Sequence, residues 1–358
     1  MKHTPLYDLH VESGAKMGAF AGYQMPLFYP PGLIKEHLHT RKAAGLFDIS
    51  HMMHVEVTGP QAAGLIEFLC PYEAGRQELN TARYTFLLNE DAGIIDDLII
   101  TRLGTERFLI VANAGCADKD LAHIQSHAAD FDAAAQVIPR GFLALQGPDA
   151  EAVLQDRGFA VSDMEFMTAI EPKEGWFLSR TGYTGEDGFE IAMPEPECAG
   201  FARDLLADER VMPVGLGARD SLRLEAGLSL YGQDLSETIS PHEAGLLWAI
   251  PKDLRSGGVF IGAAALADKI ERGRSRMRVG LSAEGRMPAR AGAELQDETG
   301  RSIGVVTSGG YGPSIERGVA LGLISVDAAD GAIFADVRGK IIPMQKVKLP
   351  FVPHQYKR

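Results

Sequence analysis

The sequence predicts an α+β protein made of two units with antiparallel sheets, followed by a separate all-β domain. Three observations indicate this class. The chain has 358 residues, more than one hydrophobic core usually supports, so two or three domains are expected. Strands joined by turns and followed by a helix recur in the N-terminal part, which is typical of α+β folds. From about residue 274 onward, short strands alternate with glycine turns.

The clearest run of predicted elements lies at residues 82–128. Ala82–Leu88 reads as a strand, residues 89–93 as a hairpin turn and residues 94–100 as the returning strand. Arg107–Ala112 is a third strand, and Ala117–Ala128 is a helix. This order describes an α+β unit with an antiparallel sheet.

The preceding segment is expected to hold one helix and one strand. Residues 33–44 predict the helix, with Gly45 as its C-terminal cap. Residues 46–58 predict a strand that leads to a turn at Gly59.

Two Gly-Pro pairs suggest an internal repeat. A predicted strand runs into Gly59-Pro60 and a helix follows, and the same order recurs at Gly147-Pro148. This echo predicts two related α+β halves.

A helix is predicted at residues 221–230, with Arg219 and Arg223 one turn apart on one stripe. Two arginines in this arrangement either bind carboxylates of a ligand or form salt bridges with Glu225 and Asp220, and both alternatives stay open. The glycines before the helix lack the third glycine and the ribose-binding acid of a dinucleotide fingerprint, so that motif is rejected.

The C-terminal part predicts a small barrel or sandwich. Its short strands fall at residues 278–281, 303–310, 319–324 and 346–349. Residues 269–278 carry clustered lysine and arginine and predict a linker that is also the main positive patch.

Composition excludes several classes of function. A formal net charge of -13 argues against a general nucleic-acid binder, which needs a positive field. The three cysteines, Cys70, Cys116 and Cys198, have no close spacing, which favours a reducing compartment without structural zinc. The four histidines between residues 37 and 54 match no zinc motif, so no metal is expected.

No apolar run approaches the length of a membrane span, so no membrane partner is expected. The N-terminus enters patterned sequence at once and leaves no room for a signal peptide. The expected location is cytoplasmic, or an organelle matrix if a transit peptide was trimmed.

Two adjacent carboxylates interrupt the apolar strand at residues 93–100. Side chains alternate across a strand, so Asp96 and Asp97 point to opposite faces. Burial of an ionised carboxylate is costly, so each one needs hydrogen-bond donors or a raised pKa. One is expected to be structural and the other to face a pocket, and the strand pattern does not choose between them.

The chain resembles the aminomethyltransferase (T-protein) family of the glycine cleavage system along almost its whole length. The motifs that carry the resemblance are FDISHM at residues 47–52, IDDLI at 95–99, RTGYTGEDGFEI at 180–191, ARDSLRLEAGL at 218–228, SP at 240–241 and VTSGG at 306–310.

The resemblance implies three domains set like a cloverleaf around a folate. We expect residues 1–50 with 141–270 in the first domain, residues 51–140 in the second and residues 275–358 in the third. It also implies the reaction. Tetrahydrofolate, a co-substrate, takes the one-carbon unit of an aminomethyl-dihydrolipoyl carrier protein (H-protein), giving 5,10-methylenetetrahydrofolate and ammonia.

Site residues also follow from the resemblance. It places the catalytic carboxylate at Asp96, the first of the pair, and ligand-binding positions at Glu190, Arg219 and Tyr356. Glu190 is expected to pair with the donor-rich edge of the pterin, and Arg219 with a carboxylate of the folate tail.

Two further residues, Tyr84 and Asn113, lie beside Asp96 in the proposed sheet and are expected to form pocket walls. Tyr84 is expected to stack on the pterin or support it rather than act as an acid.

Two alternative functions remain open, one enzymatic and one not. The first is a tetrahydrofolate-dependent demethylase that acts on a small methylated substrate. The second is a folate-binding scaffold or an iron–sulfur assembly factor, whose cysteine signature is absent from residues 182–185. Retention of Asp96 argues against a pure binder. The basic residues 269–278 are expected either to dock an acidic carrier or to form a solvated linker.

Overall fold

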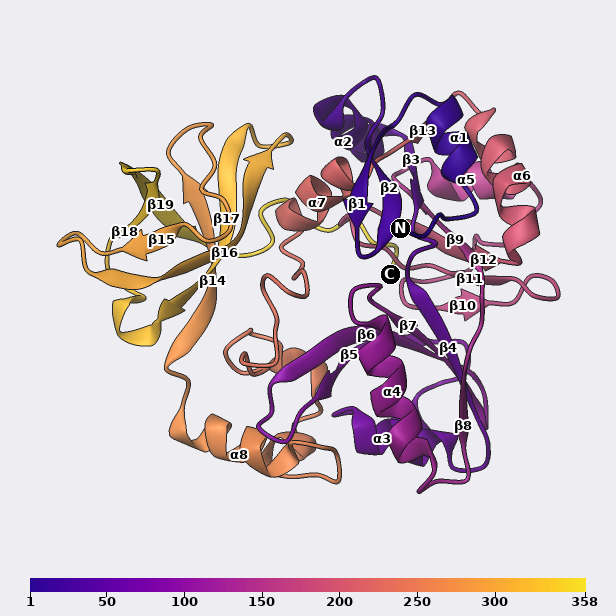
Figure 1. Ribbon diagram of the computed structural model, residues 1–358, viewed down its shortest axis with the longest axis horizontal. Helices are drawn as coiled ribbons and strands as arrows, with labels where there is room; N and C mark the ends of the chain where they lie inside the picture. Colours follow the sequence, from indigo (N-terminus) through magenta and orange to yellow (C-terminus); the bar gives the residue numbers. More distant parts are fainter.

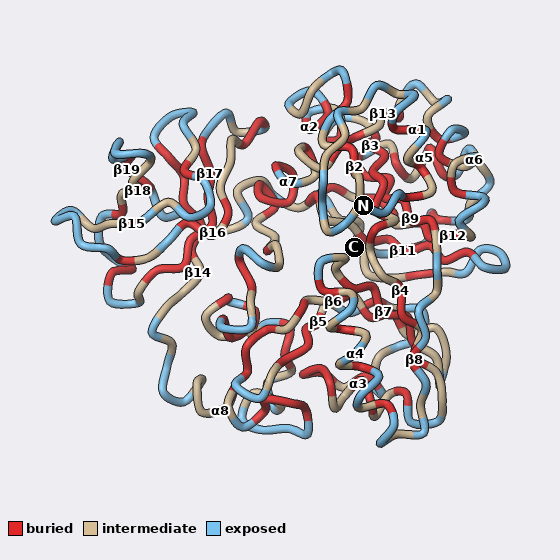
Figure 2. The backbone as a smooth tube through the Cα atoms, in the orientation of Figure 1, coloured by how far each residue is buried: buried red, intermediate tan, exposed pale blue.

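The computed structural model describes residues 1–358, which form three domains (Figure 1). In that view the first domain lies at upper right, the second at lower right and the barrel at left, which is the predicted cloverleaf arrangement. Buried residues, red in Figure 2, follow the strands of all three domains, and exposed residues gather on the outer loops. No helix combines the length and apolar character that crossing a bilayer requires.

A six-stranded sheet in the order β10-β11-β12-β9-β3-β13 forms the first domain. Neighbouring strands are antiparallel except β13 and β3, which run parallel. Its strands are β3 (Ala44–Asp48), β9 (Gly141–Gln146), β10 (Ala169–Ile170), β11 (Phe177–Ser179), β12 (Gly188–Met193) and β13 (Val211–Pro213). The remaining elements are α1 (Tyr7–Glu12), β1 (Lys16–Phe20), β2 (Tyr23–Phe28), α2 (Leu33–Lys42), α5 (Ala150–Gln155), α6 (Glu195–Leu206) and α7 (Leu216–Glu225).

The second domain contains a five-stranded antiparallel sheet in the order β5-β6-β7-β4-β8. Its elements are β4 (Met53–Thr58), α3 (Ala62–Leu69), β5 (Ala82–Leu88), β6 (Ile94–Gly104), β7 (Arg107–Ala112), α4 (Ala117–Ala128) and β8 (Ala134–Val137). Leu65 and Ile66 of α3 and Ile124 of α4 share one buried core with the strands. The predicted strands and helix of this unit are confirmed.

The two sheets are related in plan, which agrees with the predicted repeat. In each, the strand that ends in Gly-Pro is flanked on one side by the next three strands of the chain. On the other side β4 pairs directly with β8, whereas β3 lies between β9 and β13. Gly59 and Gly147 have φ angles of 125° and 126°. A Cβ atom there would lie 2.5 Å from the Asp132 carbonyl oxygen and 2.1 Å from that of Ala43, so only glycine fits.

Two local predictions near α2 are wrong. The helix ends at Lys42, and Gly45 is part of β3 rather than a cap. A Cβ atom at Gly45 would lie 2.4 Å from Thr40 Oγ1, so its absence permits the close approach of α2 to the strand. The single strand expected at residues 46–58 is in fact β3 and β4, which belong to different sheets.

Helix α7 begins earlier than predicted, at Leu216 instead of residue 221. Gly217 therefore lies in its first turn, although glycine disfavours helix. A Cβ atom at Gly217 would lie 2.7 Å from Leu33 Cδ1, so close packing against α2 outweighs propensity at this position.

The third domain is a closed barrel in the order β14-β17-β16-β15-β18-β19, which decides between the barrel and the sandwich. Its strands are β14 (Arg276–Ala283), β15 (Glu294–Gln296), β16 (Ser302–Gly312), β17 (Arg317–Ser325), β18 (Ile333–Val337) and β19 (Lys340–Val347). Strand β14 pairs with both β17 and β19, which closes the barrel and leaves no free edge.

The chain between α7 and the barrel packs on the second domain. Leu235, Leu246 and Leu266 share a buried cluster with Phe86 and Ile94. Leu266 belongs to α8 (Ala263–Arg272), which reaches almost to β14, so most of the predicted linker is regular structure. The predicted boundary placed all residues up to 270 in the first domain, whereas the part after α7 packs on the second domain.

After β19 the chain returns to the first domain. The Gln355 N–H donates to the Gly185 carbonyl at 2.8 Å, and the Phe166 N–H donates to the Lys357 carbonyl at 2.8 Å. Figure 1 shows the C-terminus between the first and second domains. The tail therefore reaches the region where the domains meet.

Candidate active site

A cavity of about 1350 Å³ lies where the three domains and the C-terminal tail meet. Most of the predicted site residues line it: Tyr84, Asn113, Glu190, Arg219 and Tyr356. The volume exceeds that of typical small-molecule pockets, about 300–1,000 Å³. The cavity can therefore hold a large ligand together with part of a second one.

Of the two adjacent acids on β6, Asp97 is the one that lines the cavity. The Tyr84 hydroxyl donates to its Oδ2 at 3.0 Å, and Asn113 Nδ2 donates to its Oδ1 at 3.0 Å. Burial and the adjacent charge of Asp96 raise the pKa of Asp97 to about 7. Asp97 therefore exchanges a proton near neutral pH, which suits a group that handles charge during a reaction.

The expectation that Asp96 faces the cavity is wrong. Its side chain is 0% exposed and shares the packed face of β6 with Ile94, Leu98 and Ile100. The two acids point to opposite faces of the strand, as predicted, but Asp97 rather than Asp96 faces the cavity. Both faces of the strand are apolar, so the sequence pattern does not show which one borders the cavity. Which face borders a cavity depends on distant segments, and no signal within the strand reveals it.

Asn113 connects the two acids. Its backbone N–H donates to Asp96 Oδ2 at 3.1 Å, and its Nδ2 donates to Asp96 Oδ1 at 2.9 Å as well as to Asp97 Oδ1. The residue follows β7, next to β6 in the sheet. Asn113 thus holds the cavity carboxylate in place and is itself held from behind by Asp96.

Tyr84 lies in the wall as predicted, with its ring against another aromatic residue. The ring stacks on Trp248, with centroids 5.6 Å apart and an interplanar angle of 15°. Trp248 lines the cavity and is 66% exposed. Sequence analysis missed Trp248, which reaches the site only through the fold of the central segment.

Glu190 and Arg219 form a charged pair of opposite sign in the first-domain wall. Thr181 Oγ1 donates to Glu190 Oε2 at 2.6 Å. The Arg219 guanidinium lies 5.0 Å from the ring centroid of Tyr183, and its Nη1 has no hydrogen-bond partner in the protein. Burial raises the pKa of Glu190 and lowers that of Arg219, and each charge opposes the shift of the other. Arg219 lines the cavity, so its guanidinium can contact a ligand there.

Arg223 has a different role from Arg219. It is 1% exposed, and its guanidinium pairs with Asp220 Oδ1 at 2.8 Å and with Asp234 Oδ2 at 2.9 Å. The sequence left open whether these arginines bind a ligand or form salt bridges. Arg223 forms the salt bridge with Asp220, whereas the guanidinium of Arg219 forms none. Glu225, the other expected partner, pairs with Arg41 and His37 instead.

Tyr356 reaches the cavity on the C-terminal tail. Its ring stacks on Phe166 with centroids 3.9 Å apart and an interplanar angle of 3°. Burial raises the pKa of Tyr356 to about 12, so the phenol keeps its proton. The hydroxyl is thus a neutral group in the wall.

Two further residues with unpartnered nitrogens, His51 and Arg278, also line the cavity. Burial lowers the pKa of His51 to about 4, so the imidazole is neutral. Arg278 lies in the stretch predicted as a linker, so its location in the site corrects that prediction. The family motif at residues 47–52 contained His51, but no separate role was inferred from it.

A buried serine–histidine–glutamate series lies outside the cavity. His37 joins Ser221 Oγ at 2.7 Å through Nδ1 and Glu225 Oε2 at 3.0 Å through Nε2. All three are buried, and none lines the cavity. A nucleophile needs access to substrate, so this series connects α2 to α7 structurally.

Comparisons with known proteins agree with this architecture. Residues 6–254 match the model of the "GCVT N-terminal domain", and residues 276–353 match that of the "Glycine cleavage T-protein C-terminal barrel domain". The chain is 41% identical to mitochondrial aminomethyltransferase of Pisum sativum, covering 99% of this chain and 90% of the relative. It is 40% identical to a probable mitochondrial aminomethyltransferase of Schizosaccharomyces pombe, covering 100% and 95%.

A solved structure shows the same fold. The crystal structure of glycine cleavage system aminomethyltransferase T from Bartonella henselae has a TM-score of 0.98 and 50% identity, covering 100% of this chain and 99% of that one. The fold is that of a one-carbon transferase. The chain belongs to the aminomethyltransferase family of the glycine cleavage system. The demethylase alternative is not favoured by these relatives.

Proposed function

We propose that this chain moves the one-carbon unit of an aminomethyl-dihydrolipoyl carrier protein to tetrahydrofolate, with Asp97 as the carboxylate at the reacting carbon. The observation that carries the proposal is a carboxyl with a pKa of about 7 in the wall of a cavity where three domains meet. The volume of about 1350 Å³ is sufficient for a folate and the end of a thioether arm.

The donor set of the cavity fits a folate. Arg219 Nη1 is a buried donor without a partner, and Glu190 is a buried acceptor. When bound, tetrahydrofolate supplies the nucleophilic nitrogens that accept the carbon. Because Glu190 and Arg219 influence the pKa values of each other, we assign both to the same edge of the pterin. This differs from the expected pairing of Arg219 with the glutamate tail.

Asp97 manages charge in this scheme. As the carbon–sulfur bond breaks, positive charge develops on the aminomethyl carbon, and an ionised carboxylate nearby stabilises it. The same group, when protonated, can return a proton to the departing sulfur. The products would be methylene-tetrahydrofolate, ammonia and the dihydrolipoyl carrier. Asn113 and Tyr84 keep the carboxylate oriented.

The resemblance assigned this role to Asp96, and the geometry favours Asp97. Asp96 is 0% exposed and lies behind Asn113, so it does not reach a ligand in the cavity. Its negative charge instead raises the pKa of Asp97. Asp96 is therefore a positioning residue in this proposal.

The partner that fits is a lipoyl carrier protein, and the basic stretch at residues 269–278 supports its docking only weakly. Arg272 pairs with Asp268 at 2.7 Å, and Arg276 pairs with Glu243 at 2.9 Å, so much of its charge is used internally. The named relatives are mitochondrial proteins. An organelle matrix therefore suits the proposed reaction as well as the cytoplasm does.

The test incubates the enzyme with aminomethyl-loaded carrier and tetrahydrofolate and measures ammonia and methylene-tetrahydrofolate together. We expect the two products in equal amounts, with little ammonia when folate is omitted. Methyl transfer from a small amine, without ammonia release from the carrier, would instead identify a demethylase.

A further inference from the structure

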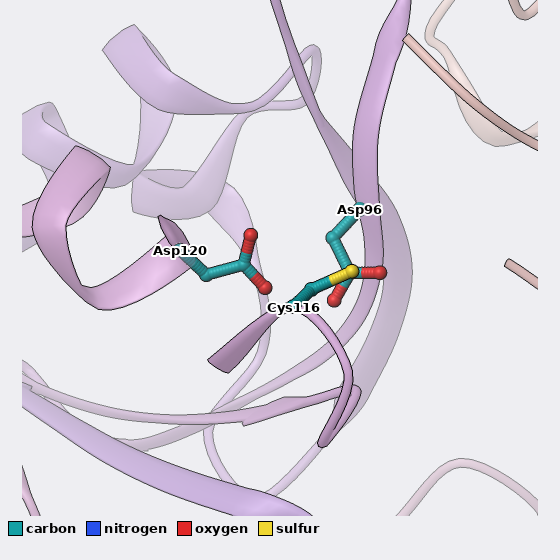
Figure 3. A group of neighbouring side chains, drawn as sticks. All are labelled: Asp96, Cys116 and Asp120. Atoms are coloured by element: carbon teal, nitrogen blue, oxygen red, sulfur yellow. The ribbon is translucent and has the colours of Figure 1, made fainter. Parts of the chain in front are cut away.

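Behind the cavity wall lies a second group of acids that the proposed reaction does not use directly. Asp96, Cys116 and Asp120 place their ligand atoms within 4.8 Å of one another. Figure 3 shows the Asp120 carboxyl pointing from α4 toward the side chains of Asp96 and Cys116. Both carboxyls are 0% exposed, and the thiol is 5% exposed. Water therefore does not solvate the two carboxyls, while Cys116 also lines the cavity.

The hydrogen bonds of the two acids are unequal. Asp96 accepts two N–H donors from Asn113. Neither oxygen of Asp120 receives any N–H or O–H donor. An ionised Asp120 would be a buried charge without a donor, next to the charge of Asp96, which is strongly unfavourable. A protonated Asp120 removes this conflict, because its O–H can donate to Asp96.

The surrounding charges agree with a neutral Asp120. Lys119, its neighbour on α4, directs its ammonium to Tyr231 at 2.8 Å and Glu237 at 3.0 Å. The thiol of Cys116 belongs to the cluster and that of Cys70 lies near Asp120. Burial raises the pKa of both thiols, so they stay neutral. Burial and the nearby carboxylates of Asp96 and Asp97 raise the pKa of Asp120 to about 10, against a smaller opposing effect of Lys119.

We propose that Asp120 is a neutral carboxylic acid that donates its proton to Asp96, and that the single negative charge of this pair sets the position and proton affinity of Asp97. Because the proton stays on Asp120, Asp96 remains an acceptor for both N–H groups of Asn113. Asn113 then holds Asp97 in the wall. The proposal rests on the proposed function only in treating Asp97 as the reacting carboxyl, and it makes Asp96 and Asp120 positioning residues.

The same three side chains could instead hold a metal ion, and the observations favour the shared proton. A metal needs the thiol and both carboxyls deprotonated. That would concentrate three negative charges in a dry site next to Asp97.

Two variants of Asp120 separate a proton donor from a mere space filler. Asp120→Asn keeps an N–H donor toward Asp96, so turnover should stay within about threefold of the parent. Asp120→Ala removes the donor, so Asp96 loses this hydrogen-bond partner and holds Asn113 less firmly. We expect turnover to fall by about tenfold or more, whereas Asp120→Asn retains it. Asp118→Ala, at an exposed position of the same helix, is the matched control.

A measurement without substrate tests the pair independently of the reaction. The ¹³C NMR signals of aspartate carboxyl carbons, assigned with the Asn variants, should show Asp120 protonated up to about pH 9 and Asp97 titrating near 7. The neighbouring charge that raises the pKa of Asp97 is that of Asp96, while Tyr84 and Asn113 donate hydrogen bonds that lower it, so Asp96→Asn should lower its midpoint.

Distinct results would overturn the two proposals. Titration of Asp120 below about pH 6, equal damage from Asp120→Asn and Asp120→Ala, or a stoichiometric metal by mass spectrometry would each refute the shared proton. Normal turnover of Asp97→Asn would refute the proposed catalytic role of Asp97, while the Asp120 titration would still decide the state of the pair.

Discussion

Asp97 lines the cavity, whereas its neighbour Asp96 is fully buried behind it on the opposite face of the same strand. One side-chain amide, that of Asn113, donates to both, at 3.0 Å and 2.9 Å. The two adjacent acids therefore differ in their access to the cavity. One can meet a ligand, and the other acts through its charge and through the amide.

This arrangement predicts different effects for two isosteric variants. Asp97→Asn should lower turnover by about two to four decades, because it removes the group that stabilises developing charge. Its folate affinity should stay within about tenfold. Asp96→Asn should cost less and should move the acid limb to lower pH, because the charge that raises the Asp97 pKa is gone. Steady-state kinetics across pH would measure both effects. A severe loss in Asp96→Asn with a mild one in Asp97→Asn would restore the assignment made from the resemblance.

Loss of the hydrogen bond between Tyr84 and Asp97 should raise the pKa of Asp97, the opposite of the effect expected for Asp96→Asn. The phenol donates at 3.0 Å to the carboxylate and so stabilises the ionised form. Tyr84→Phe removes this donor, so the Asp97 pKa should rise above about 7 and the acid limb should move to higher pH, by about half a unit to one unit. Tyr311→Phe, in the barrel, is the matched control. A limb that does not move would show that the phenol acts only as a wall.

The sequence predicted much of the second domain because its signals are local. Ala82–Leu88, Arg107–Ala112 and Ala117–Ala128 have the predicted bounds, since turn residues and apolar periodicity mark each of them. The Gly-Pro repeat is also a local pattern.

The assembly of the site could not be predicted in this way. Trp248, Arg278 and Tyr356 come from three distant segments, and only the last was expected, through resemblance. The cavity face of β6 depends on what packs against each side of the strand, which its alternation does not encode. The placement of Gly45 and Gly217 likewise follows from contacts with α2 rather than from turn or helix propensity.

Arg219 should contribute to folate affinity more than to the chemical step. Its Nη1 has no partner within the protein, so a ligand acceptor can satisfy it without breaking an existing bond. Arg219→Ala should weaken folate binding by about ten- to hundredfold, the effect of losing a charged hydrogen bond, while turnover at saturation falls less. Calorimetry would measure the affinity. Arg286→Ala, at an exposed position of the barrel domain, is the control. Unchanged affinity would reassign Arg219 to structure.

The two halves of the repeat make a stability prediction that does not depend on the reaction. Gly147 has a φ of 126°, and a Cβ atom there would lie 2.1 Å from the Ala43 carbonyl oxygen. Gly147→Ala should therefore lower the free energy of unfolding by about 3 kcal/mol or more, because both the backbone conformation and the contact are unfavourable. Gly200 lies within α6 with open space where its Cβ would be. Gly200→Ala should raise the free energy of unfolding by about 0.5–1 kcal/mol, since alanine favours helix. Denaturant titration of both variants would compare them in one experiment. A Gly147→Ala protein as stable as the parent would mean that the strand-to-helix turn relaxes without cost, and the steric basis of the repeat would then be wrong.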